Sequence, residues 1–282
     1  MKSSQTLKQQ FMKRQLKRKQ PGRNGFQFIL DPSTRRELQP FVFFDAGKSK
    51  RRDEGMFFGM HPHSGIGIIT YFEGGDLVHK DSGANDDIIK SGGVQWINAG
   101  GGIFHAEGYQ KPAEEKNEEW SLAIHQLWLQ LPEHLEEGEN SYQNVQPEAM
   151  KVIDNVKIIA GEYKEQKATL EVPYDITYLD ITLKSGEEIT IPTPKGQSRG
   201  FVFPREGKVN LHEEEISLGY LSILEENEGE LYFKAEKDAQ FVVGLTVPSE
   251  QHIVVGGGSI HSSFDALKNS QKRIQKIAME LA

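Results

Sequence analysis

Short apolar runs separated by turn residues fill most of the chain after residue 25. The segments 41–44, 56–60 and 66–72 are rich in β-branched and aromatic residues, which is typical of strands. Glycine pairs and polar clusters follow these runs, and none of them has helical spacing. Several strands at such short intervals predict a small antiparallel barrel or sandwich.

A second series of apolar runs begins near Val152 and resembles the first in number and length. Its segment 177–183 alternates between apolar and polar residues, as a half-buried strand does. The stretch between the two series is polar and proline-bounded. The pattern therefore predicts an all-β chain with two tandem barrels, residues 26–135 and 151–282, joined by a linker over 136–150.

Helical spacing occurs at the end of the chain, over residues 262–281. Leu267, Ile274 and Ile277 lie on one side of such a helix, and Ser262 or Ser263 can cap its first turn. We therefore expect the second barrel to end in a helix.

Residues 1–25 differ in composition from the rest because they are basic and contain no acidic residue. Such an arm can contact nucleic acid or act as a targeting signal. The interpretation we favour is a solvated extension, with possible helical structure, that docks on its own acidic domain or on a neighbouring subunit.

The overall composition restricts the function further. Acidic residues outnumber basic ones by 41 to 33, giving a formal charge of −8, which argues against a general nucleic-acid-binding surface. There is no cysteine, so disulfides and thiolate ligands are excluded. No apolar run reaches the length of a membrane span. We expect a soluble, cytoplasmic protein without a membrane partner.

The candidate chemistry lies between Gly55 and Glu107. One end of this stretch carries His61 and His63, and the other carries His105 and Glu107, so both pairs have the spacing i, i+2. On a strand these positions share a face, and each pair can aim at one point. Three imidazoles and a carboxylate that converge in this way predict a mononuclear metal site.

The same residues carry a resemblance to a known family. The spacing of Gly55, His61, His63 and Gly74 matches the first cupin motif. Further matches are Tyr71-Phe72, His79-Lys80-Asp81-Ser82, Val94-Gln95-Trp96, Gln126-Leu127-Trp128 and Leu131-Pro132. With these segments the chain resembles the pirins, most strongly over residues 40–135.

The resemblance implies a bicupin whose N-terminal barrel binds one metal through His61, His63, His105 and Glu107. Iron as Fe(II) is expected, and nickel, copper, manganese or zinc can replace it. It further implies a dioxygenase that acts on a quercetin-like flavonol or another enol or catechol, with Glu107 also accepting the substrate's proton. The alternatives are a redox-sensitive iron protein that regulates a partner protein, and a storage or scaffold cupin. The C-terminal barrel is expected to hold no metal.

One position departs from the family pattern. Pirins and many cupins have a glutamate four residues after the second histidine, and this chain has Gly67 there. We expect Gly67 to leave a wetter and roomier wall. The aromatic residues near the ligands could wall a planar substrate or form the barrel core: Phe57, Phe58, Trp96 and Phe104.

Two other histidines lie in this half of the chain. His79 could handle protons in the site, but its strand-end motif with Asp81 favours a structural role. His125 lies in an alternating segment, and we expect it on the polar face of a strand.

Overall fold

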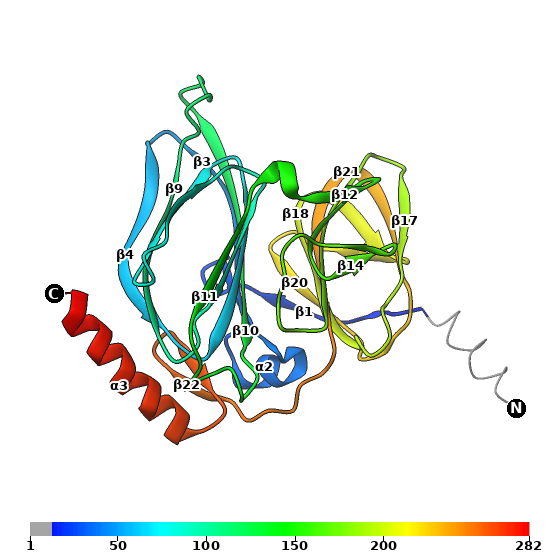
Figure 1. The fold of residues 1–282 in the computed structure, drawn as a ribbon. Coiled ribbons are helices and arrows are strands. Elements are labelled where there is room, and N and C mark those ends of the chain that lie inside the picture. Colours follow the sequence, from blue (N-terminus) through cyan, green and yellow to red (C-terminus); the bar gives the residue numbers. More distant parts are fainter. Residues whose placement is uncertain (1–12, 282) are drawn as a thin grey trace, which may run out of the picture. The chain divides into compact units, whose positions relative to one another are not determined.

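The computed structural model describes residues 13–281 and builds them mainly from antiparallel strands, with two α-helices (Figure 1). This confirms the predicted all-β class and the C-terminal helix. The described chain forms two compact units. We call Gln39–Ala149 with Ser249–Ala282 the histidine unit, and the residues up to Leu38 with Met150–Pro248 the companion unit. No helix within 13–281 is long and apolar enough to cross a membrane.

The histidine unit contains two antiparallel sheets. In one sheet, β11, β8, β5, β10 and β3 lie side by side in this order, and in the other the order is β4, β9, β6, β7. Their bounds are β3 Phe41–Arg51, β4 Gly55–His63, β5 Ile66–Glu73, β6 Asp76–Asp81, β7 Asp86–Ile89, β8 Val94–Asn98, β9 Ile103–Gln110, β10 Trp120–Gln130 and β11 Ser141–Val145. Alternate residues of these strands build two apolar clusters, one around Ile68 and Ile97 and one around Phe72 and Trp120.

The companion unit contains a larger sheet in which β1, β20, β18, β21, β16, β13 and β12 follow one another, while β17 pairs with β21 and β19 pairs with β18. The bounds of the strands in this sheet are β1 Leu16–Pro21, β12 Lys151–Ile153, β13 Val156–Ala160, β16 Ile176–Leu183, β17 Glu188–Ile191, β18 Arg199–Leu211, β19 Glu214–Ile216, β20 Tyr220–Leu224 and β21 Leu231–Thr246. Three short strands lie outside it: β2 Gln27–Phe28, and β14 Glu162–Tyr163 with β15 Gln166–Lys167, which pair with each other. Its core includes Leu179, Phe233 and Phe241, which are fully buried.

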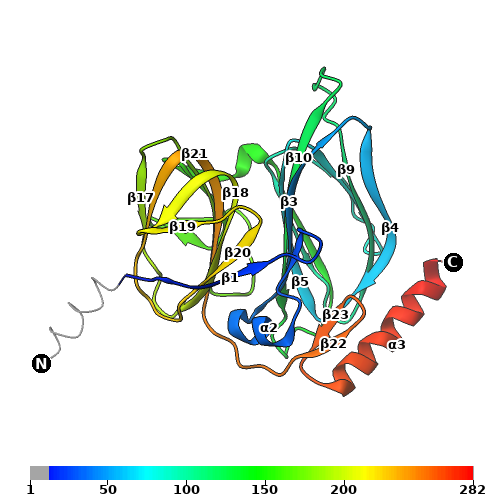
Figure 2. The ribbon, with the colours of Figure 1, turned by 180° about the vertical axis from the view of Figure 1, so that it is seen from behind.

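The described part of the basic arm is a strand and not a helix. Residues of β1 pair with β20, which Figure 2 shows from behind. The Arg14 side chain is buried and donates to backbone carbonyls, among them that of Glu225 at 2.8 Å. Lys17 and Arg18 both pair with Glu37. The arm therefore docks on its own unit, while residues 1–12 lie outside the described residues.

Both units take in chain segments that differ from the expected ranges 26–135 and 151–282. The stretch 136–150 is no free linker, because β11 pairs with β8 inside the histidine unit. The last segment, with β22 Val254–Gly256, β23 Ser259–His261 and α3 Phe264–Leu281, also belongs to the histidine unit. Which segments belong to which unit depends on backbone pairing between residues far apart in the sequence. The local sequence of each segment does not indicate that pairing.

Helix α3 begins as its sequence predicts. The Ser263 hydroxyl accepts a hydrogen bond from the Ala266 amide at 3.1 Å, as an N-cap does. Leu267 is buried, and Ile274 and Ile277 lie next to Gly102, which directly precedes β9. The helix thus covers part of the histidine unit beside β9 (Figure 1).

A short helix, α2 (Pro32–Leu38), has no counterpart among the predicted elements. Asp31 caps it, because its carboxylate accepts a hydrogen bond from the Thr34 amide at 2.9 Å. Pro32 then occupies the first helical position, where proline lacks only an amide that would have no partner. An Asp-Pro pair of this kind is the sequence signal that predicts such a helix.

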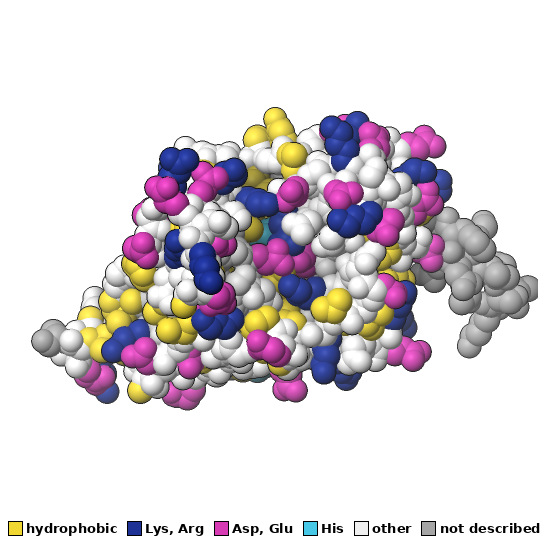
Figure 3. All heavy atoms as spheres, turned by 90° about the horizontal axis from the view of Figure 1, so that it is seen from above, with side chains coloured by type: hydrophobic (Ala, Val, Ile, Leu, Met, Phe, Trp, Pro, Cys, Tyr) yellow, Lys and Arg dark blue, Asp and Glu magenta, His cyan; other side chains and the backbone are white. Residues whose placement is uncertain are grey.

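Acidic and basic side chains are interspersed on the face of the molecule that Figure 3 shows. The negative net charge of −8 is thus not gathered into a single acidic patch on this face.

Candidate metal centre

The first histidine pair and the third histidine meet on neighbouring strands of the histidine unit. Strands β4 and β9 run antiparallel, with His61 opposite His105 and an irregularity in register between Phe58 and His61. The ring centroids of His61 and His105 are 4.3 Å apart, and those of His63 and His105 are 5.1 Å apart. The three residues can offer one ligand atom each, all within 4.8 Å of one another. Pairing of β4 with β9 therefore brings together the three histidines of the two motifs.

Two of the three imidazoles have one ring nitrogen occupied by the backbone. His61 Nδ1 lies 2.8 Å from the Gly59 carbonyl oxygen, and His63 Nδ1 lies 2.7 Å from that of Gly258. A carbonyl only accepts hydrogen bonds, so both Nδ1 atoms carry the proton. The lone pair of each ring is then on Nε2, which is the arrangement that a metal ligand needs.

Buried polar atoms without hydrogen-bond partners mark the same place. Neither ring nitrogen of His105 has a partner among the described residues, and the residue is completely buried. The carboxylate oxygen Oε2 of Glu107 is also buried and unpartnered, 3.9 Å from His105 Nδ1. Burying such groups without a partner is costly. A divalent cation held by nitrogen and oxygen donors would satisfy them, so these residues fit a metal.

Burial and mutual repulsion keep two of the imidazoles neutral. Burial, with a smaller effect of His105, lowers the pKa of His63 from 6.5 to about 4. Burial, followed by the effects of His61 and His79, lowers the pKa of His105 from 6.5 to about 3. Neutral imidazole is the form that binds metals, so near neutral pH both residues are ready to act as ligands.

Strand β10 adds two residues to which sequence analysis gave no role. The Gln126 amide nitrogen donates to Glu107 Oε1 at 2.9 Å, and Trp128 Nε1 donates to the Gln126 oxygen at 3.0 Å. The Trp128 ring also lies 4.9 Å from that of His63. Gln126 thus occupies one oxygen of Glu107 and leaves the other, Oε2, 3.9 Å from His105 Nδ1. The i, i+2 spacing of Gln126 and Trp128 on a predicted strand is the sequence signal that places both side chains on the same face.

A second carboxylate lies near Glu107. Asp45 of β3 is half-buried and pairs in register with Gln126. Burial raises the pKa of Asp45, and the negative charge of Glu107 raises it further. The site therefore contains a carboxyl group that takes up a proton more readily than an exposed aspartate does.

The expected roomy wall at Gly67 does not exist. A Cβ atom at Gly67 would lie 2.0 Å from the Trp96 indole, which is 1% exposed. The ring of Trp96 therefore fills the space that the missing glutamate would need. Trp96 is a core residue, whereas Phe57 and Phe58 are exposed. Neither phenylalanine is part of the barrel core.

His79 and His125 stand outside the cluster of three. His79 is buried, its Nε2 lies 3.0 Å from Asp81 Oδ2, and its ring stacks on Tyr142 at 4.6 Å. These contacts agree with a structural role. His125 is also buried and stacks on Tyr71, so the expectation of a polar-face position was wrong.

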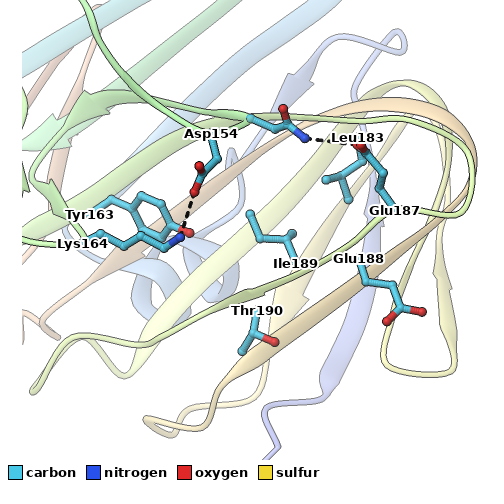
Figure 4. Close-up of a pocket in the computed structure, with 9 residues that line it drawn as sticks. Asp154, Tyr163, Lys164, Leu183, Glu187, Glu188, Ile189 and Thr190 are labelled. Carbon is cyan, nitrogen blue, oxygen red and sulfur yellow. Dashed lines mark hydrogen bonds and ion pairs between the residues drawn. The ribbon is translucent and has the colours of Figure 1, made fainter.

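A pocket of about 380 Å³ lies in the companion unit (Figure 4). Lys164 pairs with Asp154 at its rim, and Asn155 donates to Glu187. Its other lining residues are Tyr163, Leu183, Glu188, Ile189 and Thr190. Since this lining contains no histidine, the pocket is no counterpart of the histidine cluster.

Known proteins share both the sequence and the fold. A protein from Pseudomonas aeruginosa named "Putative quercetin 2,3-dioxygenase" is 29% identical over 253 residues, which cover 85% of this chain and 86% of that protein. Human pirin is 28% identical over 245 residues, covering 83% of this chain and 81% of pirin. A crystal structure of quercetin 2,3-dioxygenase from Acinetobacter baumannii has the same fold, with a TM-score of 0.78 and 24% identity over 95% of this chain and 96% of that one.

The sequence model of the pirin family matches residues 22–129, a range that contains all three histidines of the cluster and Glu107. The expectation raised by the sequence motifs is thereby confirmed. Residues 22–129 therefore form a pirin-type domain, and the chain is similar to pirin and to pirin-like proteins over most of its length.

Proposed function

We propose that the histidine unit binds one divalent metal ion through His61, His63, His105 and Glu107, and that the protein is a dioxygenase. The observation that carries this proposal is the set of buried, unpartnered donor atoms on His105 and Glu107 beside two imidazoles whose Nε2 atoms are free to bind. Iron is the metal we favour, while nickel, copper, manganese and zinc suit the same donors.

The proposed substrate is a quercetin-like flavonol or another enol or catechol, with dioxygen as the second substrate. This choice follows the names of the relatives described above. When bound, the metal supplies Lewis acidity and an electron path between the organic substrate and dioxygen. The four ligands are contributed by only two strands, β4 and β9.

The remaining steps belong to side chains. In this proposal Glu107 accepts the proton of the substrate hydroxyl, while the Gln126 amide donates a hydrogen bond to Oε1 of the same carboxylate. Asp45, with its raised pKa, can take up or return a proton nearby. Trp128 is half-buried and lies beside His63, so its ring offers a flat apolar surface to a planar substrate. His61 is also half-buried, which leaves the cluster approachable from its side.

Oxygen uptake tests this function. The metal-free protein is reconstituted anaerobically with Fe(II) and mixed with quercetin and dioxygen. We expect uptake with wild-type protein and with His134→Ala, which removes an exposed imidazole, and no uptake with His61→Ala. Stoichiometric iron binding without oxygen consumption would end the flavonol proposal.

A second candidate is a redox-sensitive iron protein that binds a partner protein. Phe57, Phe58 and Met60 are 63%, 46% and 45% exposed on the strand that carries His61. Exposed apolar side chains that lie this close together are typical of a surface that binds another protein. In that case hydrogen exchange of the β4 amides should differ between the Fe(II) and Fe(III) forms. Equal exchange in both forms would argue against this candidate.

A further inference from the structure

The segment Val254–Ser262, which we call the C-terminal clasp, lies against the end of β4. The Gly258 carbonyl oxygen is 2.7 Å from His63 Nδ1. Next to it, the Ser64 hydroxyl donates to the Ser259 hydroxyl at 2.8 Å, and the Ile260 amide donates to the Ser64 carbonyl at 3.2 Å. The clasp therefore contacts a candidate ligand and the residue that follows it.

Buried polar groups hold the clasp in place. Ser64 Oγ lies 2.9 Å from His261 Nε2, and His261 Nδ1 lies 3.4 Å from Glu136 Oε2. The Ser262 amide donates to the same Glu136 oxygen at 2.7 Å. Ser64 and His261 are 0% exposed and Glu136 is 2% exposed. Because no substrate can reach Ser64, this serine, histidine and carboxylate form an anchor and not a hydrolytic site.

The contact with Gly258 distinguishes His63 from the other histidines of the cluster. His61 Nδ1 meets the carbonyl of Gly59, two residues earlier on the same strand. His63 Nδ1 meets a carbonyl that is 195 positions further along the chain. The hydrogen-bond acceptor of a metal-binding imidazole fixes both its tautomer and its ring orientation. For His63 that acceptor comes from the C-terminal clasp.

We propose that the C-terminal clasp is a positioning element for the metal centre. The Gly258 carbonyl keeps the proton of His63 on Nδ1 and directs Nε2 toward the metal. The anchor of Ser64, His261 and Glu136 holds that carbonyl in place. This inference rests on the proposed metal centre, but the tautomer of His63 can be measured without metal.

The chain offers a matched pair of glycines for the test. Gly258 has a φ of +75°, and a Cβ atom there would lie 3.0 Å from the Pro62 carbonyl oxygen and 3.3 Å from His63 Nδ1. An L-residue at that φ is strained, so Gly258→Ala must shift the carbonyl. At the neighbouring Gly257 a Cβ atom would meet nothing within 4 Å. Gly257→Ala is therefore the control.

The first measurement is nitrogen NMR of the metal-free protein with labelled imidazoles, where His63→Asn assigns the His63 signals. We expect His63 to be protonated at Nδ1 in wild type and Gly257→Ala, and to be a mixture of tautomers in Gly258→Ala. The second measurement is affinity for Ni²⁺ by competition with a chelator. Affinity should fall about 10- to 100-fold in Gly258→Ala and stay unchanged in Gly257→Ala.

Thermal unfolding of the metal-free variants shows whether each one folds. If Gly258→Ala does not fold, Glu136→Gln replaces it, because this substitution weakens the anchor without straining the backbone. A mixture of His63 tautomers and a lower Ni²⁺ affinity are then expected for Glu136→Gln. Unchanged tautomer and affinity in a folded variant would overturn the proposal. Wild-type protein that binds no metal but shows the expected tautomers would refute the metal centre and leave the positioning of His63 standing.

Discussion

The indole of Trp96 occupies the place that a side chain at Gly67 would take, with only 2.0 Å between the ring and a Cβ atom at residue 67. Strands β5 and β8 are paired, and Trp96 is opposite Ile69 in that pairing. The Trp96 ring therefore fills the space in which the family's glutamate side chain would lie. A carboxylate cannot be restored at residue 67 while Trp96 keeps its position.

Because Trp96 fills this space, the effects of substitutions at Gly67 and Trp96 on the free energy of unfolding should be strongly coupled. Gly67→Ala should destabilise the protein by about 1–3 kcal/mol, because it overpacks a buried site. In a Trp96→Leu background the same substitution should cost clearly less, since the smaller side chain leaves room. Urea unfolding of the four proteins measures the coupling. Gly59→Ala, where a Cβ atom meets nothing within 4 Å, is the control. Equal costs in both backgrounds would contradict the packing seen here.

Gln126 should influence metal binding without being a ligand. Its amide donates to Glu107 Oε1 at 2.9 Å, so Gln126→Ala leaves the carboxylate free to turn. We expect about 10- to 100-fold weaker metal affinity, as for other residues that orient a ligand. Gln110→Ala removes an amide from the opposite face of β9 and should have no effect. Unchanged affinity in Gln126→Ala would show that the Glu107 orientation does not depend on it.

The stability of the metal-free protein should fall in acid because of His63. Its pKa in the folded state is about 4, below the ordinary 6.5, so the unfolded chain takes up the proton first. The free energy of unfolding should therefore decrease as pH falls from about 6.5 to about 4, by up to about 1.4 kcal/mol per pH unit for this group. Urea titrations across that range should give a shallower slope for His63→Gln than for wild type or His134→Gln. Parallel slopes would disprove the buried, neutral state of His63.

Metal loading should stabilise the histidine unit. A ligand at a hundred times its Kd adds about 2.7 kcal/mol to the free energy of unfolding when only the folded state binds it. Scanning calorimetry of wild-type protein with Ni²⁺ should show a higher Tm that a chelator reverses. His105→Ala should lose this shift because it removes a ring nitrogen at the centre of the cluster, while His134→Ala should keep it. A shift that survives His105→Ala would place the metal elsewhere.

Local patterns were sufficient to predict the strands and the histidine cluster. The i, i+2 spacing in His61 and His63 works because a strand alternates its faces, whatever the rest of the chain does. Helix α3 was predicted for a similar reason, since its cap and its apolar residues lie within one turn or a few turns of each other. By contrast, Glu107 lies beside the cluster, 3.9 Å from His105 Nδ1, and its place among the ligands is still a prediction.

Features that depend on distant segments were not predictable in the same way. Pairing of β1 with β20 and the contact of Gly258 with His63 join residues about two hundred positions apart. Nothing near Gly258 in the sequence indicates that its carbonyl faces an imidazole. The filling of the Gly67 site by Trp96 also requires knowing that β5 and β8 are neighbours. Helix α2 is different, because the Asp31-Pro32 pair that begins it is a local sequence signal.

The return of the C-terminal segment to the histidine unit also sets an order for synthesis. His61, His63 and His105 are translated before the second segment of the companion unit, Met150–Pro248, but the carbonyl that meets His63 and the helix beside β9 are translated after it. Domains generally fold as units while the chain is being made. Here the first barrel to emerge from the ribosome must wait for the last residues before its histidines have all their contacts. A released chain that ends at Pro248 would therefore contain every residue of the companion unit and only part of the histidine unit.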